Sequence, residues 1–184
     1  MPDRTQAEQP SRFRVAKIDG VHCGLLRIRG VAADAVARAG AIVGTALPTA
    51  PNTTTGYSPR ALWLAPGEWL IAQNRPLDSL AENFTAALAG VTWHFVDVSD
   101  GRTVYSIMGT HARDFLNRGL SLDLHPCVFP QGGCAQTIFA NIPVLLHLIG
   151  DEPEFHLHVD SSFEDYLDSW IARVRAVFDP DRQT

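Results

Sequence analysis

The sequence lacks the features that recruit a nucleic acid or a membrane. Its 184 residues contain 15 Lys and Arg against 20 Asp and Glu, a formal net charge of -5. Without a basic run to neutralise phosphates, a nucleic-acid partner is not expected. The N-terminal segment has no apolar core of a secretion signal, and no later run approaches the roughly 20 apolar residues of a membrane span. We therefore expect a cytoplasmic protein with no membrane partner.

Cysteine is scarce, and the local motifs of several enzyme classes are absent. Three cysteines, an odd number in a chain without a signal peptide, favour reduced thiols over a disulfide framework. The sequence contains no G-x-G-x-x-G, G-x-S-x-G, H-E-x-x-H or C-x-x-C pattern. These absences argue against the simplest dinucleotide, hydrolase, zinc and redox sites. What is present is 46% hydrophobic content, ample for one compact domain or two half-domains.

An internal repeat organises the chain. A strand-like segment ends at Gly30 and a short helical pattern follows up to Gly40; the same arrangement recurs at Gly109 and Gly119. Both pairs of glycines are offset by 79 positions (109 − 30 and 119 − 40). The same offset relates apolar residues of a second helix in each half: Phe84 to Phe163 and Leu88 to Leu167. We interpret this as a duplicated strand-helix unit in which a glycine ends each helix.

Each repeat is predicted to be a ferredoxin-like unit. Residues 61–72 form a hairpin around Pro66-Gly67, since proline fixes φ and glycine accepts positive φ in a type II turn. A helix and a closing strand over 91–99 give the first half the order β-α-β-β-α-β. The second half has a hairpin over 137–150, a strand over 154–159 and a long amphipathic helix, and repeats this order incompletely.

The predicted fold class is therefore α+β, with two ferredoxin-like β-α-β-β-α-β half-units. The predicted boundaries are a flexible N-terminus over 1–19, a first half over 20–99, a second half over 100–178 and a C-terminal tail over 179–184.

The segment HPCVFPQGGCAQT, residues 125–137, concentrates the chemical residue types. Six residues separate Cys127 from Cys134, whereas a structural zinc site uses pairs such as C-x2-C. A zinc deaminase would need a second cysteine where Pro130 stands. The Gly132-Gly133 pair lacks a P-loop lysine, which argues against phosphate binding. We interpret the cysteines as buried or inert, since free cysteine often behaves as a small hydrophobic residue; a thiol nucleophile with a base from elsewhere is the alternative.

Other candidate groups have structural explanations. His156 and His158 share a face of a predicted strand, but no third ligand is placed to complete a metal site. Trp63 and Trp69 flank the hairpin, where they either stack on a planar ligand or pack in the core or against a subunit. Turn or cap duty explains three aspartates near strand ends: Asp97, Asp100 and Asp160. We therefore predict no catalytic, cofactor-binding or metal-binding residue in this chain.

Five segments taken together resemble a known family. They are ALWLAPGEWL at 61–70, DVSDGRTVYSIMGTHARDFL at 97–116, LDL at 122–124, FPQGGCAQT at 129–137 and SSFEDYL at 161–167. From about residue 20 to 178, the chain resembles the gamma subunit of heterotetrameric sarcosine oxidase. That family is similar to a shortened form of the folate-binding aminomethyltransferases of glycine cleavage. The resemblance implies an α+β fold of repeated ferredoxin-like units.

The resemblance also implies a supporting role in a larger enzyme. Such a complex demethylates sarcosine oxidatively to glycine with hydrogen peroxide, and passes the one-carbon unit to tetrahydrofolate. FAD, FMN, NAD, zinc and tetrahydrofolate are expected on the alpha, beta and delta subunits, and none on this chain. By residue count, Leu167 stands where the aminomethyltransferases carry an aspartate at the folate site. Asp165 and Asp168 would point elsewhere on the helix.

We therefore expect a non-catalytic gamma subunit of a sarcosine oxidase, or of a sibling complex acting on another N-methyl amino acid. The segment 129–137 is predicted to be a bent connector that contacts the alpha subunit, with Cys134 buried. The candidate interface residues are Phe129, Pro130, Gly132, Gly133, Gln136 and Thr137. The alternatives are a stand-alone folate-dependent aminomethyltransferase and a ligand-binding module that uses Trp63 and Trp69.

Overall fold

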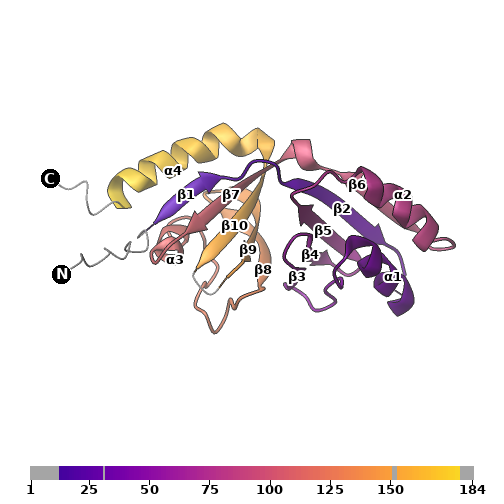
Figure 1. Ribbon diagram of the computed structural model, residues 1–184. Coiled ribbons are helices and arrows are strands. Elements are labelled where there is room, and N and C mark those ends of the chain that lie inside the picture. Colours follow the sequence, from indigo (N-terminus) through magenta and orange to yellow (C-terminus); the bar gives the residue numbers. More distant parts are fainter. Residues whose placement is uncertain (1–12, 31, 151–152, 179–184) are drawn as a thin grey trace, which may run out of the picture.

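Two five-stranded antiparallel sheets, each with helices on one face, form the computed structural model, which describes residues 13–30, 32–150 and 153–178 (Figure 1). The first sheet has the strand order β3-β4-β5-β2-β6. The elements of this first half are β2 (His22–Ile28), α1 (Ala33–Val43), β3 (Thr54–Gly56), β4 (Arg60–Ala65), β5 (Glu68–Gln73), α2 (Asp78–Ala87) and β6 (Trp93–Asp97). This is the predicted β-α-β-β-α-β order with one further strand, β3, at the sheet edge.

The second sheet has the strand order β1-β7-β10-β9-β8. Its elements are β1 (Arg14–Lys17), β7 (Arg102–Met108), α3 (Ala112–Leu116), β8 (Cys134–Phe139), β9 (Ile142–Leu148), β10 (Glu154–Asp160) and α4 (Glu164–Phe178). Short 3-10 turns, η1 (Ser99–Gly101) and η2 (Ser161–Phe163), precede β7 and α4. The predicted α+β class is confirmed. None of the described helices is long and apolar enough to cross a membrane.

The two halves match position by position once β1 is counted with the second half. The order β6-β2-β5-β4-β3 corresponds to β1-β7-β10-β9-β8. The second sheet therefore has a counterpart for every strand of the first. Its closing strand, residues 14–17, comes before the first half in the sequence and not after the second. Residues 14–17 belong to the segment 1–19, which was predicted to be a flexible N-terminus. They are instead a strand, in which Arg14 pairs with Met108 and Lys17 with Tyr105.

Glycines mark the repeat, with one correction to the prediction. Gly30 and Gly109 both have positive φ, 78° and 104°, where the chain turns from a strand toward a helix. Gly40, predicted to end the first helix, is buried inside α1, which continues to Val43 and is capped by Gly44 at φ 86°. Glycine tolerates this left-handed conformation without the strain of a Cβ atom.

The 79-residue offset does not extend to the second helices. The buried residues of α2 are Leu80 and Phe84, and those of α4 are Leu167 and Ile171. These pairs are offset by 87 residues (167 − 80 and 171 − 84). The predicted match of Phe84 to Phe163 is therefore wrong in register, because the second half has more residues between its later strands: β8 begins 80 positions after β3 (134 − 54), whereas β10 begins 86 positions after β5 (154 − 68).

Alternation along the strands gives each sheet two buried faces. In β10, Phe155, Leu157 and Val159 belong to the core beneath α3 and α4. A corresponding core lies beneath α1 and α2. The opposite faces of the two sheets meet in a third cluster: Cys23, Leu62, Leu70, Ala72, Cys134 and Leu145. The helices thus lie outside, and the two sheets face each other at the centre (Figure 1).

Gly24 of β2 allows Phe95 of β6 to lie across the sheet toward α2. A Cβ atom at Gly24 would stand 2.3 Å from Phe95 Cζ and 3.2 Å from Leu77 Cδ1. We expect Gly24→Ala to lower the free energy of unfolding by about 1–3 kcal/mol through overpacking. Chemical denaturation would measure this loss. Adding Phe95→Leu should restore part of the stability, and Gly101→Ala, with nothing within 4 Å, is the control; equal effects at both glycines would contradict the packing argument.

Candidate functional site

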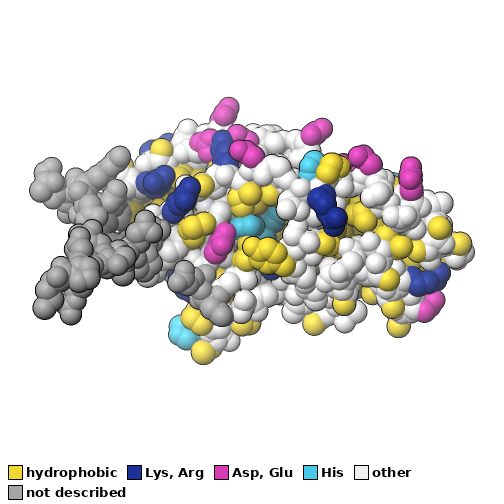
Figure 2. All heavy atoms as spheres, in the orientation of Figure 1, with side chains coloured by type: hydrophobic (Ala, Val, Ile, Leu, Met, Phe, Trp, Pro, Cys, Tyr) yellow, Lys and Arg dark blue, Asp and Glu magenta, His cyan; other side chains and the backbone are white. Residues whose placement is uncertain are grey.

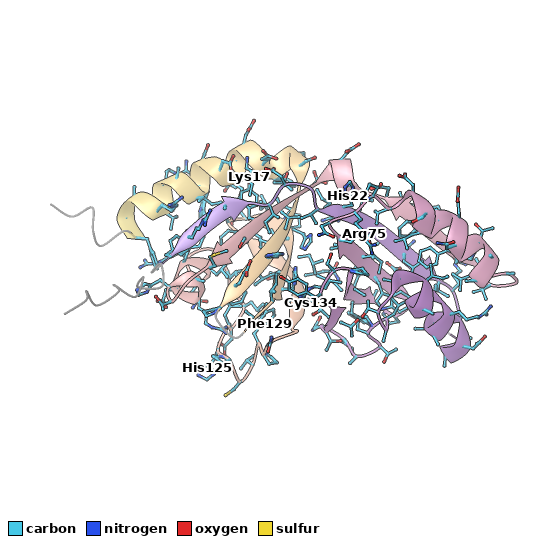
Figure 3. All side chains as sticks on the ribbon, in the orientation of Figure 1. Lys17, His22, Arg75, His125, Phe129 and Cys134 are labelled. Carbon is cyan, nitrogen blue, oxygen red and sulfur yellow. The ribbon has the colours of Figure 1, made fainter. Side chains whose placement is uncertain are left out.

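The connector, residues 129–137, leads into β8 and lies against the first half of the same chain. The backbone N–H of Cys134 donates to the carbonyl of Asn52 at 2.9 Å, and that of Thr54 donates to the carbonyl of Gly132 at 2.8 Å. Thr53 and Gly133 form an antiparallel bridge. Figure 3 shows Cys134 where the two sheets meet. The most chemical segment of the sequence is therefore a seam between the two halves.

The structure divides the six predicted interface residues into two groups. Phe129 is buried, with its ring stacked 6.3 Å from that of Phe155, and Gly133 is buried where a Cβ would meet the Pro130 carbonyl at 2.8 Å. Gly132 is half-buried with φ 76°. These three residues serve contacts within the chain, and the exposed or half-buried residues are Pro130, Gln136 and Thr137.

Two exposed aliphatic side chains extend the outer surface of the connector. Val128 is 59% exposed and Ile138 is 51% exposed. Gln136 and Ile138 are two positions apart on β8 and share one face of that strand, and Nε2 of Gln136 donates to the carbonyl of Leu64 at 2.7 Å. We call Val128, Pro130, Gln136 and Ile138 the connector surface. Sequence reasoning missed Val128 and Ile138, because an aliphatic residue next to a core strand gives no signal of its exposure.

The two cysteines of the segment 125–137 have opposite environments. Cys134 is buried, with Sγ 3.4 Å from the Thr53 carbonyl and 3.6 Å from the Trp63 carbonyl, and burial raises its pKa to about 11. The thiol is therefore protonated at neutral pH, which is unfavourable for a nucleophile. The prediction of a buried Cys134 is confirmed. Cys127 is exposed, so it is not a buried residue, and the interpretation of it as an inert thiol stays a prediction.

The tryptophan and aspartate candidates have structural duties. Trp69 is buried, and its Nε1 donates to the Pro48 carbonyl at 2.7 Å, so it offers no face to a planar ligand. Asp97 accepts from the backbone N–H of Ser99 at 2.9 Å, and Asp160 accepts from that of Ser162 at 3.0 Å. The bond of Asp160 caps η2, and that of Asp97 forms a turn just before η1, so these two aspartates have the turn and cap duties expected of them.

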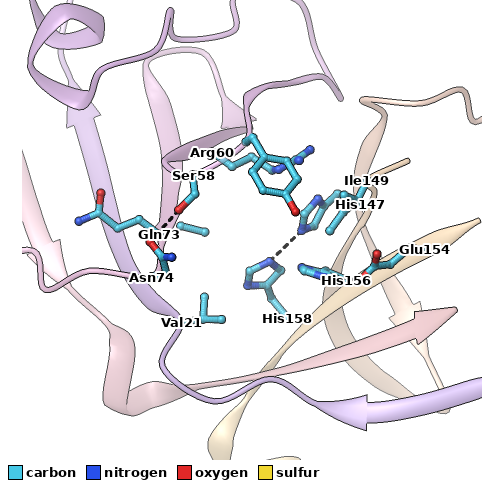
Figure 4. Close-up of a pocket in the computed structure, with 12 residues that line it drawn as sticks. Val21, Ser58, Arg60, Gln73, Asn74, His147, Ile149, Glu154, His156 and His158 are labelled. Carbon is cyan, nitrogen blue, oxygen red and sulfur yellow. Dashed lines mark hydrogen bonds and ion pairs between the residues drawn. The ribbon is translucent and has the colours of Figure 1, made fainter. Parts of the chain in front are cut away.

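The inner sheet faces enclose a cavity of about 200 Å³ between the two halves (Figure 4). The first half contributes the residue before β2, the turn between β3 and β4, the start of β4 and the end of β5. The second half contributes residues of β9 and β10 together with Ile149. The lining consists of Val21, Tyr57, Ser58, Arg60, Ala72, Gln73, Asn74, His147, Ile149, Glu154, His156 and His158. Histidine atoms are visible at the middle of the molecule in Figure 2, where the two halves meet.

Three histidines form one wall of this cavity. Nε2 of His147 lies 3.2 Å from Nε2 of His158, and the rings of His147 and His156 have centres 5.2 Å apart. His156 Nε2 donates to Glu154 at 3.1 Å. Burial is the main cause that lowers the pKa of all three, that of His158 to about 3. At neutral pH these imidazoles are uncharged.

His147 was missed in the sequence. It lies in the continuous apolar run of β9, so the sequence does not show which face of the sheet it occupies. Val144, Leu146 and Leu148 face the helix-covered core. Because side chains alternate along a strand, His147 must face the other way. Its Nδ1 is buried without a hydrogen-bond partner among the described residues. The third imidazole that the sequence analysis did not find for His156 and His158 is therefore present on the adjacent strand.

The three histidines are not a metal centre. In the part of the chain that the structure describes, no group of three or more His, Cys, Asp or Glu is arranged to hold a metal ion. His156 Nε2 is directed to Glu154, whereas Nε2 of His147 and His158 face each other. Sγ of Cys23 lies 3.9 Å from Nδ1 of His158, and burial raises the pKa of the Cys23 thiol to about 11. The donors therefore do not converge on one point.

The acidic residues near the last helix are bound to neighbours. Leu167 is fully buried in the second core. Asp168, beside it, accepts from Tyr105 Oη at 2.8 Å and forms an ion pair with Lys17 at 2.6 Å. Glu164 forms an ion pair with Lys17 and accepts from Thr103 Oγ1 at 2.6 Å. These carboxylates connect α4 to β1 and β7.

This architecture is shared with an aminomethyltransferase of known structure. The chain superposes on the glycine cleavage system aminomethyltransferase T from Bartonella henselae with a TM-score of 0.63 over 87% of this chain and 45% of that one, at 11% identity. At this identity the likeness shows the fold alone. The class of protein is thus an α+β chain with the aminomethyltransferase T fold.

Sequence comparison narrows the class to one family. The pattern described as "Sarcosine oxidase, gamma subunit family" matches residues 29–177. The chain is 30% identical over 138 residues to the sarcosine oxidase subunit gamma of Corynebacterium sp. (strain P-1), covering 74% of this chain and 67% of that one. It is 34% identical over 114 residues to the subunit gamma of an Arthrobacter species, covering 61% and 56% respectively. The chain therefore belongs to the sarcosine oxidase gamma subunit family.

A solved structure agrees with this membership. A chain of the heterotetrameric sarcosine oxidase from Corynebacterium sp. U-96, in complex with pyrrole 2-carboxylate, superposes with a TM-score of 0.81. The match has 27% identity and covers 90% of this chain and 85% of that one. The resemblance seen in the sequence is confirmed.

The buried histidines predict acid lability. In the unfolded chain His147 and His158 take up protons near pH 6.5, whereas burial opposes this in the folded chain. The free energy of unfolding should be highest above about pH 6.5 and fall as the pH is lowered toward about 3. The double variant His147→Leu/His158→Leu should reduce this slope by about one to two protons. Denaturant titration between pH 7.5 and roughly pH 4.5 measures it.

The exposed residue His125 provides the matched control for this measurement. Since its side chain is in solvent, His125→Asn should leave the slope close to that of the wild type. An unchanged slope in the double variant would mean that these two histidines are not the proton-linked groups.

Proposed function

We propose that this chain is the non-catalytic gamma subunit of a heterotetrameric oxidase that acts on sarcosine or on a closely related N-methyl amino acid. The observation that carries the proposal is the similarity over 90% of the chain to one chain of a heterotetrameric sarcosine oxidase. In this proposal the complex forms glycine and hydrogen peroxide and transfers the one-carbon unit to tetrahydrofolate. The duplicated fold is that of two ferredoxin-like halves.

The surroundings of α4 favour a non-catalytic role for this chain. An active aminomethyltransferase would need a free carboxylate in a pocket, but the corresponding position is Leu167, which is buried in the core. The adjacent Asp168 is held by Lys17 and Tyr105. A carboxylate that neutralises a lysine and accepts from a tyrosine is poorly placed to activate a substrate.

The cavity between the sheets does not fit the large cofactors of such a complex. Pockets for drug-sized ligands measure roughly 300–1,000 Å³, whereas this one measures about 200 Å³. A folate, a flavin or a dinucleotide exceeds it. From the membership of the family, we propose that tetrahydrofolate, FAD, FMN, NAD and zinc are held by the alpha, beta and delta partners. We also propose no nucleic-acid or membrane partner and a cytoplasmic location.

The function is tested by purifying the tagged chain from its own cells. We expect larger, yellow, flavin-bearing partners to co-purify, and the assembly to release hydrogen peroxide from sarcosine or from another N-methyl amino acid. The isolated chain should show no turnover and no saturable binding of tetrahydrofolate. Turnover of a methylated amine by the chain alone would contradict the proposal and would favour the aminomethyltransferase alternative.

We further propose that the connector surface contacts the alpha subunit. Its exposed aliphatic residues, Val128 and Ile138, are typical of positions covered by a partner. A buried charge without a counter-ion is costly at such a contact. Ile138→Glu should therefore lower the amount of this chain recovered with the alpha subunit at least about tenfold, which corresponds to 1.4 kcal/mol.

The control is Ala86→Glu, which adds the same charge on the exposed side of α2. Recovery is measured by pull-down of the tagged alpha subunit from cells that express all subunits, with the thermal midpoint of each variant as a check of folding. Full recovery of Ile138→Glu would remove the connector surface from the interface.

A further inference from the structure

Arg60 is a buried cation without an ion pair. Its side chain is at the start of β4, and the residue is only 7% exposed. The ion pairs among the residues that the structure describes do not include it. Its guanidinium carbon lies 5.6 Å from the centre of the Tyr57 ring. Since arginines in a protein interior are normally paired, the guanidinium of Arg60 is available to an anion that enters the cavity.

The acidic residue in the cavity lining does not meet this requirement. Glu154 Oε1 accepts from Ser106 Oγ at 3.0 Å and from His156 Nε2 at 3.1 Å. Glu154 is close enough to favour the charged form of Arg60, but burial still lowers the arginine pKa overall. The cavity lining therefore has one positive and one negative group that are not in direct contact, and the guanidinium donors of Arg60 have no hydrogen-bond partner among the described residues.

The remaining lining is suited to a small ligand with one negative charge. The three histidines are neutral at physiological pH and add no second cation. A single guanidinium beside a glutamate matches a monoanion better than a doubly charged phosphate. Val21, Ala72 and Ile149 give the cavity an apolar part. Ser58 Oγ donates to Asn74 Oδ1 at 2.9 Å, which directs the polar groups of these two residues to one side (Figure 4).

We propose that the cavity between the two sheets binds a small monocarboxylate, whose carboxylate pairs with Arg60 and whose apolar body lies against Val21, Ala72 and Ile149. The volume of about 200 Å³ is that of a few water molecules, at about 30 Å³ each in the liquid. It admits a molecule of the size of acetate or benzoate. The site is formed by both halves of this chain, and it does not depend on the proposed oxidase function.

The test is a titration of the full-length chain with benzoate, with benzamide as its neutral analogue. Isothermal titration calorimetry should show saturable binding of benzoate and at least tenfold weaker binding of benzamide, because only the former supplies a charge for the guanidinium. Arg60→Met should abolish benzoate binding. Arg27→Gln is the matched control, since Arg27 is exposed and paired with Glu68, and it should bind as the wild type does.

The thermal midpoint without ligand separates a binding role from a structural one. If Arg60 serves a ligand, then Arg60→Met removes a largely buried charge that has no direct ion pair, and it should unfold at the same temperature as the wild type or higher. Benzoate should raise the midpoint of the wild type in a concentration-dependent way and leave that of Arg60→Met unchanged. A large fall in the midpoint of Arg60→Met without ligand would assign Arg60 to the fold and overturn the proposal.

Three further outcomes would overturn it. These are no saturable binding of acetate or benzoate to the wild type, equal binding of benzoate and benzamide, and binding of inorganic phosphate in place of the carboxylates. If the chain is obtained only with its partner subunits, the difference between wild-type and Arg60→Met isotherms of the assembly reports this cavity alone. Failure of these titrations would leave the co-purification result, and hence the proposed function, unaffected.

Discussion

The pairing of β1 with β7 is the constraint on which the rest of the structure depends. It places the first strand of the chain in the second sheet, so the chain crosses between the halves once before β2 and again before β7. The crossings are joined by hydrogen bonds, in which Ile18 donates to the Val104 carbonyl and Cys23 donates to Ser99 Oγ. Lys17 adds ion pairs to two carboxylates of α4. The two halves are thereby fixed as one body rather than as two linked domains.

This fixed arrangement determines the character of the inner sheet faces. At the seam the inner face is apolar and closes around Cys134, Leu62 and Leu145. A short distance along β9 and β10, the same face carries histidines and meets Arg60 from the other half. Buried polar groups reduce stability unless they are paired. Nδ1 of His147 has no hydrogen-bond partner among the described residues, so it lowers the stability of the fold. Such local costs are typical of binding sites, where stability has been exchanged for the capacity to bind.

Much of the architecture follows from local sequence patterns. Gly67 has the positive φ expected of the Pro66-Gly67 turn, and Leu167 lies in the core as the apolar stripe predicts. Local patterns failed where the cause is distant in the chain. The four residues of β1 contain no sign of a partner strand in the other half. The cavity escaped notice for the same reason, because Arg60 and His147 meet only when the two sheets pack. The connector was singled out as a contact with another subunit, whereas within this chain its glycines and Phe129 serve an internal seam that only the packed sheets reveal.

The position of β1 has a consequence for how the chain is made. A ribosome releases residues 14–17 well before residues 102–108, so the earliest strand has no partner while the first half forms around it. The second sheet can close only when β7, β10 and α4 have emerged, and the N-terminal strand must then be free to join it. The biogenesis of this protein therefore ends with the incorporation of one of its first-synthesised segments, and a chaperone or subunit that occupied the edge of β7 too early would arrest it half-assembled.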